Sequence, residues 1–488
     1  MVPASTAAGE PRAASEALRE LEAFLAASAS ERQGFDQLER ESERRGREVA
    51  RLALQAHLDA TGNGDVGEAI VIDGGPGPVR LSYKRLHVRS LVSLVGEVSV
   101  SRMGYAAPGH ASIRPLDAAL RLPERCYSYE LQRRLVRLTV CGPFEEAIDI
   151  LAEWTGQKIP KRSAEQILID VAADSDIFYQ RRSDAASALG EGEILVGAID
   201  CKGIPMVKPD GAAKIVRRKK GDKANKKKMA TVAAVFSQPP RVRTPEEVLD
   251  SLFSTDQTCP PSQRHPKPTD KRVWASLTSG KDNFIADVRA EMDRRDPHRR
   301  HTWVMVTDGE RALQRRVAAN FEGVTLVLDL LHVMEKCWKA AHALHPEGSP
   351  EATAFVRERA GRILRGEVSQ VVKGLRQMVT KRRLTGNKAR TLRSVADYFY
   401  ANRDRMRYDT YLANGWPIAS GSVESTCKNL VRDRFERSGM RWCEDGAEPM
   451  LEMRAVYLSG DLDEYFALHI QLDQERLYPN SVRELVAK

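Results

Sequence analysis

The chain has 488 residues, 42% of them hydrophobic and 29% charged, which is enough apolar material for more than one core and excludes a disordered chain. No apolar run approaches the ~18 residues of a membrane helix, and the N-terminus lacks the basic start and apolar stretch of a secretory signal, so we expect a cytoplasmic protein with no membrane partner. The 76 Lys and Arg exceed the 67 Asp and Glu, giving a net charge of +9, and the seven scattered cysteines indicate neither a disulfide framework nor a structural zinc site.

The N-terminal region, residues 1–66, is expected to form an amphipathic helical arm. Its apolar side chains recur at helical spacing, at Leu18, Leu21, Phe24 and Leu25. Folding back on its own domain is favoured over pairing with a second copy. Residues 61–80, rich in Gly and Pro, then predict a linker, and the alternating stretches LHVRSLVSLV and GEVSVSRMGY predict a β-hairpin. Residues 67–116 are therefore expected to hold a linker and a small β unit.

Residues 117–190 predict helices with helix-turn-helix spacing. Gly156 can end one helix, Pro160 cannot continue it, and Ser163 can cap the next with its side-chain oxygen. Helical hairpins of many kinds share this spacing, so a purely structural role stays open. In the DNA-binding interpretation, the start of the second helix meets bases and phosphates, and the residues placed there are Lys158, Lys161, Arg162 and Gln166.

The chain changes character at residue 191, and residues 191–345 predict a mixed α/β sheet. Its expected strands are ILVGAID, the hairpin partner GIPMVKP, KMATVAAVFS, TWVMVTDG and GVTLVLDLLHV, with a helix from Glu310 to Asn320 between the last two. The Pro-rich excursion at 238–270 has no assignment, and a long helical stretch is expected after it. Residues 346–412 are expected to be all helical, 413–460 to contain one further helix, and 461–488 to form a C-terminal tail.

Two aspartates are expected at the carboxyl ends of strands, where sites form in α/β sheets: Asp200 closes ILVGAID and Asp308 closes TWVMVTDG. Taken singly, each is more simply a turn or capping residue. Glu424 is a third acid in the first turn of a later helix, where it could also form a capping arrangement with Ser420 or Ser422. Three converging carboxylates would repel one another, so the hypothesis of a shared site requires divalent cations, and carboxylate oxygens suit Mg²⁺.

Basic residues are concentrated in a few runs. Residues 214–228 hold nine basic residues and one acid in fifteen positions, and smaller clusters lie at 294–300 and 381–383. A polyanion is the natural partner, although such runs are also found as solvated loops. The sequence has no GxxxxGK[ST] loop or GxGxxG turn, so no nucleotide cofactor is expected.

Four motifs in order carry a family resemblance: AIDCKGIPM, VMVTDGE, LVLDLLHVMEKCWKAA and PIASGSVESTCKNLVRDRFERSGMRW. This set resembles the ISKra group of bacterial insertion-sequence transposases, within the DDE transposase class and related to Mutator-like transposases. The likeness also includes SLVGEVSVSRMGY and GPFEEAIDILAEWTGQKIPKRSAEQI, so it covers roughly residues 80 to 458.

The resemblance implies a ribonuclease-H-like core, a mixed five-stranded sheet with an all-helical insertion at 346–412, preceded by a mostly helical region with a helix-turn-helix. It implies that Asp200, Asp308 and Glu424 hold two Mg²⁺ (or Mn²⁺) ions and catalyse DNA strand cleavage and strand transfer. Asp329 and His332 resemble an Asp-x-x-His signature of an accessory pair, although a helix-capping role is as plausible for them. Such a protein binds transposon terminal inverted repeats and target DNA, acts as a homodimer or higher oligomer, and is associated with the bacterial nucleoid.

Other basic residues could follow the DNA backbone. They are Arg217, Arg218, Lys219, Lys220, Lys226, Lys227, Lys228, Lys428 and Arg432, with Arg434 and Arg437 on the same helix as Arg432. Two alternatives stay open. One is a catalytically inactive, domesticated DNA-binding protein, and the other is a structure-selective DNA nuclease on the same fold.

Overall fold

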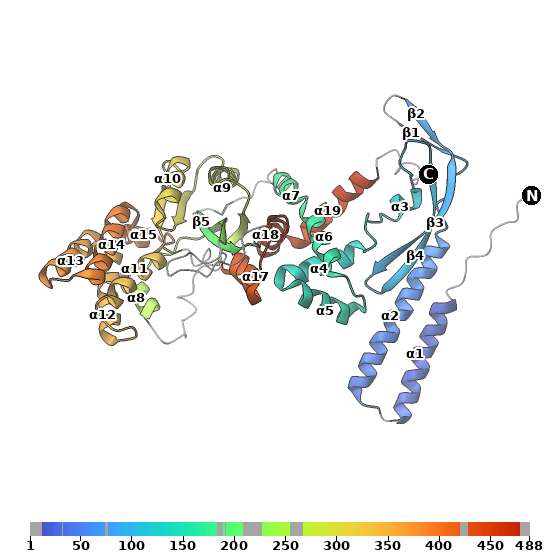
Figure 1. The fold of residues 1–488 in the computed structure, drawn as a ribbon, viewed down its shortest axis with the longest axis horizontal. Helices are drawn as coiled ribbons and strands as arrows, with labels where there is room; N and C mark the ends of the chain where they lie inside the picture. Colours follow the sequence, from blue (N-terminus) through green and yellow to red (C-terminus); the bar gives the residue numbers. More distant parts are fainter. Residues whose placement is uncertain are drawn as a thin grey trace, which may run out of the picture. The chain divides into compact units, whose positions relative to one another are not determined.

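The computed structural model describes residues 12–31, 33–73, 77–182, 189–190, 192–207, 227–253, 267–419 and 428–478 (Figure 1). The chain divides into two compact units. The first comprises Met1–Asp174 together with Asp461–Lys488, and the second comprises Ser175–Gly460. No helix among the described residues is both long and apolar enough to cross a bilayer.

The first unit begins with a helical hairpin of α1 (Arg12–Glu31) and α2 (Phe35–Ala60), which lie side by side in Figure 1. Helix α2 also lies along strand β4. The Gln55 side chain donates to the Ser99 carbonyl at 2.9 Å and accepts from the Ser99 N–H at 2.8 Å. The amide therefore pairs with the strand as a neighbouring backbone would, and the prediction that the arm folds back on its own domain is confirmed.

Two antiparallel pairs of strands follow the arm. Strands β3 (Tyr83–Ser93) and β4 (Gly96–Ala106) form the predicted hairpin. Strands β1 (Ile70–Asp73) and β2 (Pro78–Leu81) lie where a linker was expected at 61–80, so that prediction was wrong. Both strands are too short to show a clear period in the sequence. They are stabilised because Ile70 and Leu81 are buried against Tyr105.

A group of helices completes the N-terminal part of the first unit: α3 (Pro115–Ala119), α4 (Tyr129–Cys141), α5 (Phe144–Thr155) and α6 (Lys161–Ala172). Helix α5 ends at Gly156, whose φ of 71° is the left-handed conformation that glycine adopts most easily, as predicted. The prediction that Ser163 caps the next helix was wrong. Helix α6 begins directly after Pro160, whose φ of −60° already suits a helix start, and Ser163 is its third residue.

The last described segment returns to the first unit as helix α19 (Leu462–Leu477), in a region expected to be a tail. Its side chains converge on Asp174, which is 1% exposed. His469 Nδ1 lies 2.7 Å and Arg476 Nη1 lies 2.6 Å from that carboxylate, and the Tyr465 hydroxyl donates to the Val171 carbonyl. These contacts join residues about 300 positions apart, which no local sequence pattern could predict.

The second unit is built on a five-stranded mixed sheet with the order β7-β6-β5-β8-β9. Strand β6 is antiparallel to both β5 and β7, whereas β8 is parallel to both β5 and β9. The predicted mixed five-stranded sheet is confirmed, and it is compatible with a ribonuclease-H-like core. The strands are β5 (Ile194–Pro205), β6 (Lys227–Gln238), β7 (Thr269–Ser276), β8 (Thr302–Thr307) and β9 (Thr325–Leu328).

Two details of the sheet differ from the prediction. GIPMVKP is not a separate hairpin partner, because β5 continues without a turn through Cys201 and Lys202 while it pairs with β6. Strand β7 lies where a helical stretch was expected. The Pro-rich segment at 238–270, which had no predicted structure, includes helix α8 (Pro245–Phe253). Strand β7 pairs with β6 and with no other strand among the described residues, so its position depends on a partner distant in sequence.

Helices cover the sheet. Side chains of α9 (Lys281–Arg295) and α10 (Arg311–Asn320) form one core with the strands, among them Phe284, Val288, Leu313 and Val317 against Ile199 and Val235. Helix α18 (Glu444–Ser459) packs along β7, and α7 (Ser175–Arg182) contacts α18.

The region after β9 is helical, as expected for residues 346–412. It comprises α11 (Leu330–His342), α12 (Pro350–Leu364), α13 (Val368–Lys381), α14 (Gly386–Asn402), η2 (Arg403–Arg405) and α15 (Tyr408–Ala413). Short helical segments follow at η3 (Lys428–Arg432), α17 (Asp433–Phe435) and η4 (Arg437–Gly439). The predicted helical position of Glu424 lies outside the described residues.

Glu452 on α18 gives the fold a pH dependence that can be measured. Burial, together with Glu448 and Asp176, raises the pKa of Glu452 to about 7, although Ser175 donates a hydrogen bond to it at 3.0 Å. Because the pKa of Glu452 is higher in the folded state than in the unfolded state, the folded protein loses stability as the pH rises from about 4.5 to about 7. The loss in the free energy of unfolding is up to about 3 kcal/mol, and it is absent below pH ~4.5. We expect Glu452→Gln to raise the urea midpoint at pH 8 and to change it little at pH 5. An equal shift at both pH values, or a shift matched by the exposed control Glu347→Gln, would contradict this assignment.

Candidate active site

Three aspartates lie where the parallel pairing of three neighbouring strands, β5, β8 and β9, ends. The register pairs Ile199 of β5 with Thr307 of β8, and Thr307 with Leu328 of β9. Each of these three residues is directly followed in the sequence by an aspartate: Asp200, Asp308 and Asp329. Adjacent strands lie about 5 Å apart, so the structure brings these distant sequence positions together at the edge where α/β sheets place their sites.

The prediction that Asp200 closes its strand was wrong in detail. Strand β5 runs on to Pro205, because its antiparallel partner β6 keeps pairing with it, whereas the parallel pairing with β8 ends at Ile199. Asp200 therefore marks the end of the parallel ladder and not the end of the strand. Asp308 directly follows β8, which ends at Thr307, as predicted.

Electrostatic interactions also connect the two aspartates. Burial raises the pKa of Asp308, and the charge of Asp200 raises it further, whereas the Glu310 N–H, which donates to Asp308 Oδ1 at 3.0 Å, and the nearby His332 lower it. Burial also raises the pKa of the Cys201 thiol, with smaller contributions from Asp200 and Asp308. Asp200 and Asp308 thus form a partly desolvated pair of like charges, which favours a bound cation or proton.

Polar contacts position the loop that carries Asp308. Gln314 of α10 donates to the Asp308 carbonyl oxygen at 2.9 Å, and Lys281 Nζ lies 3.4 Å from Glu310 Oε2. The Asp200 carboxylate accepts the Cys201 N–H at 2.7 Å. Sequence reasoning missed Gln314 and Lys281, since neither lies in a motif.

The two residues of the predicted accessory pair, Asp329 and His332, make different contacts. Asp329 is 2% exposed and caps α11 by accepting the Leu331 N–H at 2.8 Å, while its own N–H donates to the Thr307 carbonyl at 2.9 Å. These contacts fit the capping interpretation. His332, in the first turn of α11, lies 3.4 Å from Glu335 and close enough to Asp308 to lower the pKa of that carboxyl.

Within the described ranges, no group of three or more His, Cys, Asp or Glu side chains is arranged to hold a metal ion. Glu424 and the two serines that could cap its helix, Ser420 and Ser422, lie outside those ranges. Among the three acids predicted to share a site, the structure therefore places Asp200 and Asp308 only.

The residues predicted to contact DNA near α6 are only partly available. Lys158 and Arg162 are exposed. Lys161, the first residue of α6, lies 2.5 Å from Glu145, and Gln166 donates to Asp170 at 3.0 Å. Lys158 and Arg162 are therefore the stronger candidates of the four.

The basic residues near the core have different surroundings. Lys227 and Lys228 form ion pairs with Glu436 and Glu444, and Arg432 is exposed with its guanidinium 3.9 Å from Glu436. Arg434 is fully buried with its guanidinium 4.8 Å from the centre of the Trp442 ring, so its predicted role along DNA was wrong. Outside the described residues lie Arg217, Arg218, Lys219, Lys220, Lys226 and the side chain of Lys428.

A tyrosine that the sequence did not indicate packs against the Asp308 loop. A Cβ atom on Gly309 would lie 1.9 Å from the Tyr398 hydroxyl, so a larger residue at position 309 would have to displace the Tyr398 ring. Burial raises the pKa of Tyr398, and the charge of Asp308 raises it further. The helical region therefore borders the candidate site directly.

Comparisons with known proteins give little further information. No protein-family model matches the sequence, and no curated protein matches it. Among solved structures, the chain is similar to the Drosophila P element transposase strand transfer complex, with 10% sequence identity, a TM-score of 0.25, and coverage of 69% of this chain and 80% of that chain. A TM-score this low assigns no function.

Proposed function

We propose that the protein is a DDE-type DNA transposase of a bacterial insertion sequence, similar to the ISKra group, that cleaves DNA strands and joins them to a target. The observation that carries the proposal is the position of Asp200 and Asp308 directly after the last pair of the β5/β8 parallel ladder. The order and directions of the strands in this sheet fit a ribonuclease-H-like core. The four sequence motifs that flank these residues support it.

The chemistry of the two carboxylates fits hard divalent cations. They are adjacent, and burial and mutual repulsion disfavour the charge on Asp308, so a cation would relieve both costs. We assign the third carboxylate to Glu424. When bound, two Mg²⁺ or Mn²⁺ ions would activate the attacking oxygen and stabilise the leaving 3′ oxygen. The hydrogen bonds from Glu310 and Gln314 hold the Asp308 loop in place for this role.

We assign recognition of the transposon ends to α5 and α6, with α6 as the recognition helix of a helix-turn-helix. Lys158 and Arg162 are exposed at its start, where phosphates and base edges would be contacted. Two ends must be paired in transposition, so the active form would be a homodimer or higher oligomer.

The test uses the purified full-length protein, supercoiled plasmid, and linear DNA that carries the terminal repeats of the element. We expect nicking and joining that require Mg²⁺ and stop when it is chelated. Nicking without joining would replace the proposal with a structure-selective nuclease, and binding without nicking would replace it with an inactive DNA-binding protein.

A further inference from the structure

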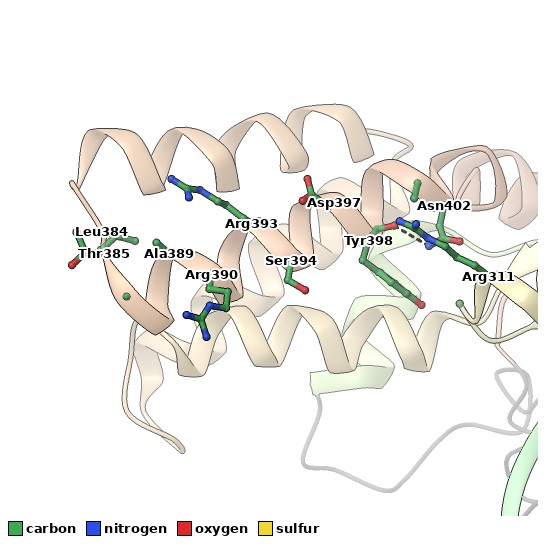
Figure 2. Close-up of a pocket in the computed structure, with 13 residues that line it drawn as sticks. Arg311, Leu384, Thr385, Ala389, Arg390, Arg393, Ser394, Asp397, Tyr398 and Asn402 are labelled. Carbon is green, nitrogen blue, oxygen red and sulfur yellow. Dashed lines mark hydrogen bonds between the residues drawn. The ribbon is translucent and has the colours of Figure 1, made fainter. Parts of the chain in front are cut away.

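A basic groove runs along α14 and begins beside Asp308. It has a volume of about 890 Å³ and is lined by Gly309 in the loop after β8, by Arg311 at the start of α10, and by α14 with the residues just before it. Figure 2 shows the lining residues along α14, with Arg311 close to Tyr398 and Asn402. We call it the α14 groove. Three of its lining residues are arginines: Arg311 of α10, and Arg390 and Arg393 of α14.

Within the part of the chain that the structure describes, the three arginines of the α14 groove are not neutralised by an acid. Arg311, Arg390 and Arg393 make no hydrogen bond or ion pair with any described residue. Asp397 is the one acid among the described lining residues, and its carboxylate lies 2.8 Å from Arg376. Exposed arginines from α10 and α14 that have no partner among the described residues are suited to an anionic ligand, because a planar guanidinium binds phosphate through two hydrogen bonds.

One end of the α14 groove reaches the candidate active site. Tyr398 lines the groove and packs on Gly309, the residue after Asp308, and Lys336 Nζ lies 5.1 Å from the Tyr398 ring centre. The other end lies at the start of α14, where Arg382 and Arg383 are exposed in the basic cluster of the sequence. Gly386 and Tyr398 are twelve residues apart, or about 18 Å along a helix.

We propose that the α14 groove binds the phosphate backbone of the DNA that flanks the reacting phosphodiester. A length of about 18 Å matches the rise of about five nucleotides of one strand along the axis of a duplex, at 3.4 Å each. The inference rests on the proposed function, and it adds a second DNA contact, separate from α5 and α6, that would hold the strand in line with Asp308. Arg390 and Arg393 are three residues apart on the exposed face of α14, so they would contact neighbouring phosphates.

The experiment measures binding of the full-length protein to a 40-bp duplex and to inorganic phosphate, ATP and GTP, all without divalent ions. We expect the double variant Arg390→Gln and Arg393→Gln to bind the duplex about tenfold or more weakly at 0.15 M salt. The slope of log affinity against log salt should become shallower by about two, because two phosphate contacts are lost. The matched control is Lys339→Gln with Lys373→Gln, two exposed lysines outside the groove, and it should leave the slope unchanged.

Each outcome decides the proposal. An affinity and slope equal to those of the control would overturn it, as would nucleotide or phosphate binding that the Arg390 and Arg393 variant abolishes while duplex binding stays intact. Thermal unfolding of each variant separates loss of contact from loss of fold. This experiment measures binding and not cleavage. If the protein binds DNA through the α14 groove but never cuts it, the proposed transposase function is contradicted and the proposed DNA contact is not.

Discussion

Replacing Asp308 by Asn is expected to lower the rate of DNA cleavage by about a thousandfold or more, or about 4 kcal/mol of lost transition-state stabilisation. An amide has the same shape as the carboxylate but binds a hard cation poorly. Its oxygen can still accept the Glu310 N–H that Asp308 now accepts at 3.0 Å, so the loop should keep its conformation. Burial already disfavours the charge of Asp308, so removing that charge should not destabilise the fold.

Several measurements separate this role from a structural one. Asp308→Cys should be inactive with Mg²⁺ and regain part of its activity with Mn²⁺, which accepts a thiolate more readily. The double variant Asp200→Asn with Asp308→Asn should be no slower than either single variant, because residues that act as one unit are not additive. The control is Asp282→Asn, an exposed acid on α9 that pairs with Arg316. Cleavage by Asp308→Asn at a rate close to wild type would remove this residue from the site.

The candidate aspartates were predictable because each ends a run of buried strand residues that is visible in the sequence. The exact geometry was not. Asp200 stands inside β5, and only the pairing with β6, about 30 residues later, keeps the strand extended past a sequence that resembles a turn. The position of Asp200 in the candidate site therefore depends on where the parallel pairing of β5 with β8 stops. That end point is set by tertiary contacts.

Elements stabilised by distant partners were the ones missed. The polar sequence of strand β7 did not predict a strand. Its position depends on pairing with β6 and on the ion pair between Arg272 and Glu291 of α9. Likewise, α19 is fixed by Asp174, and Tyr398 by its contact with Gly309. In each case a buried contact between remote positions outweighs the local pattern.

A buried charge network on α9 provides the largest expected effect on folding. The Glu291 carboxylate is 3% exposed and lies 2.7 Å from Arg272 of β7, 2.6 Å from Arg294 and 2.7 Å from Arg295, whose side chain is almost completely buried. Burial would raise the pKa of Glu291, but the three guanidinium groups outweigh it and lower the pKa to about 2. The carboxylate therefore stays charged and fixes the helix to the edge strand of the sheet.

Glu291→Gln is expected to reduce the free energy of unfolding by about 3–5 kcal/mol at pH 7, because it leaves buried guanidinium charge without its partner. The stabilising effect of a depressed carboxyl pKa is present above the unfolded value near 4.5 and is lost as the pH falls toward 2, so the difference from wild type should shrink in that window. Urea unfolding followed by circular dichroism measures the change. Asp36→Asn, an exposed acid paired with the exposed Arg40, should change stability by less than about 1 kcal/mol. A loss for Glu291→Gln no larger than this control would show that packing of α9, and not the network, holds the helix on the sheet.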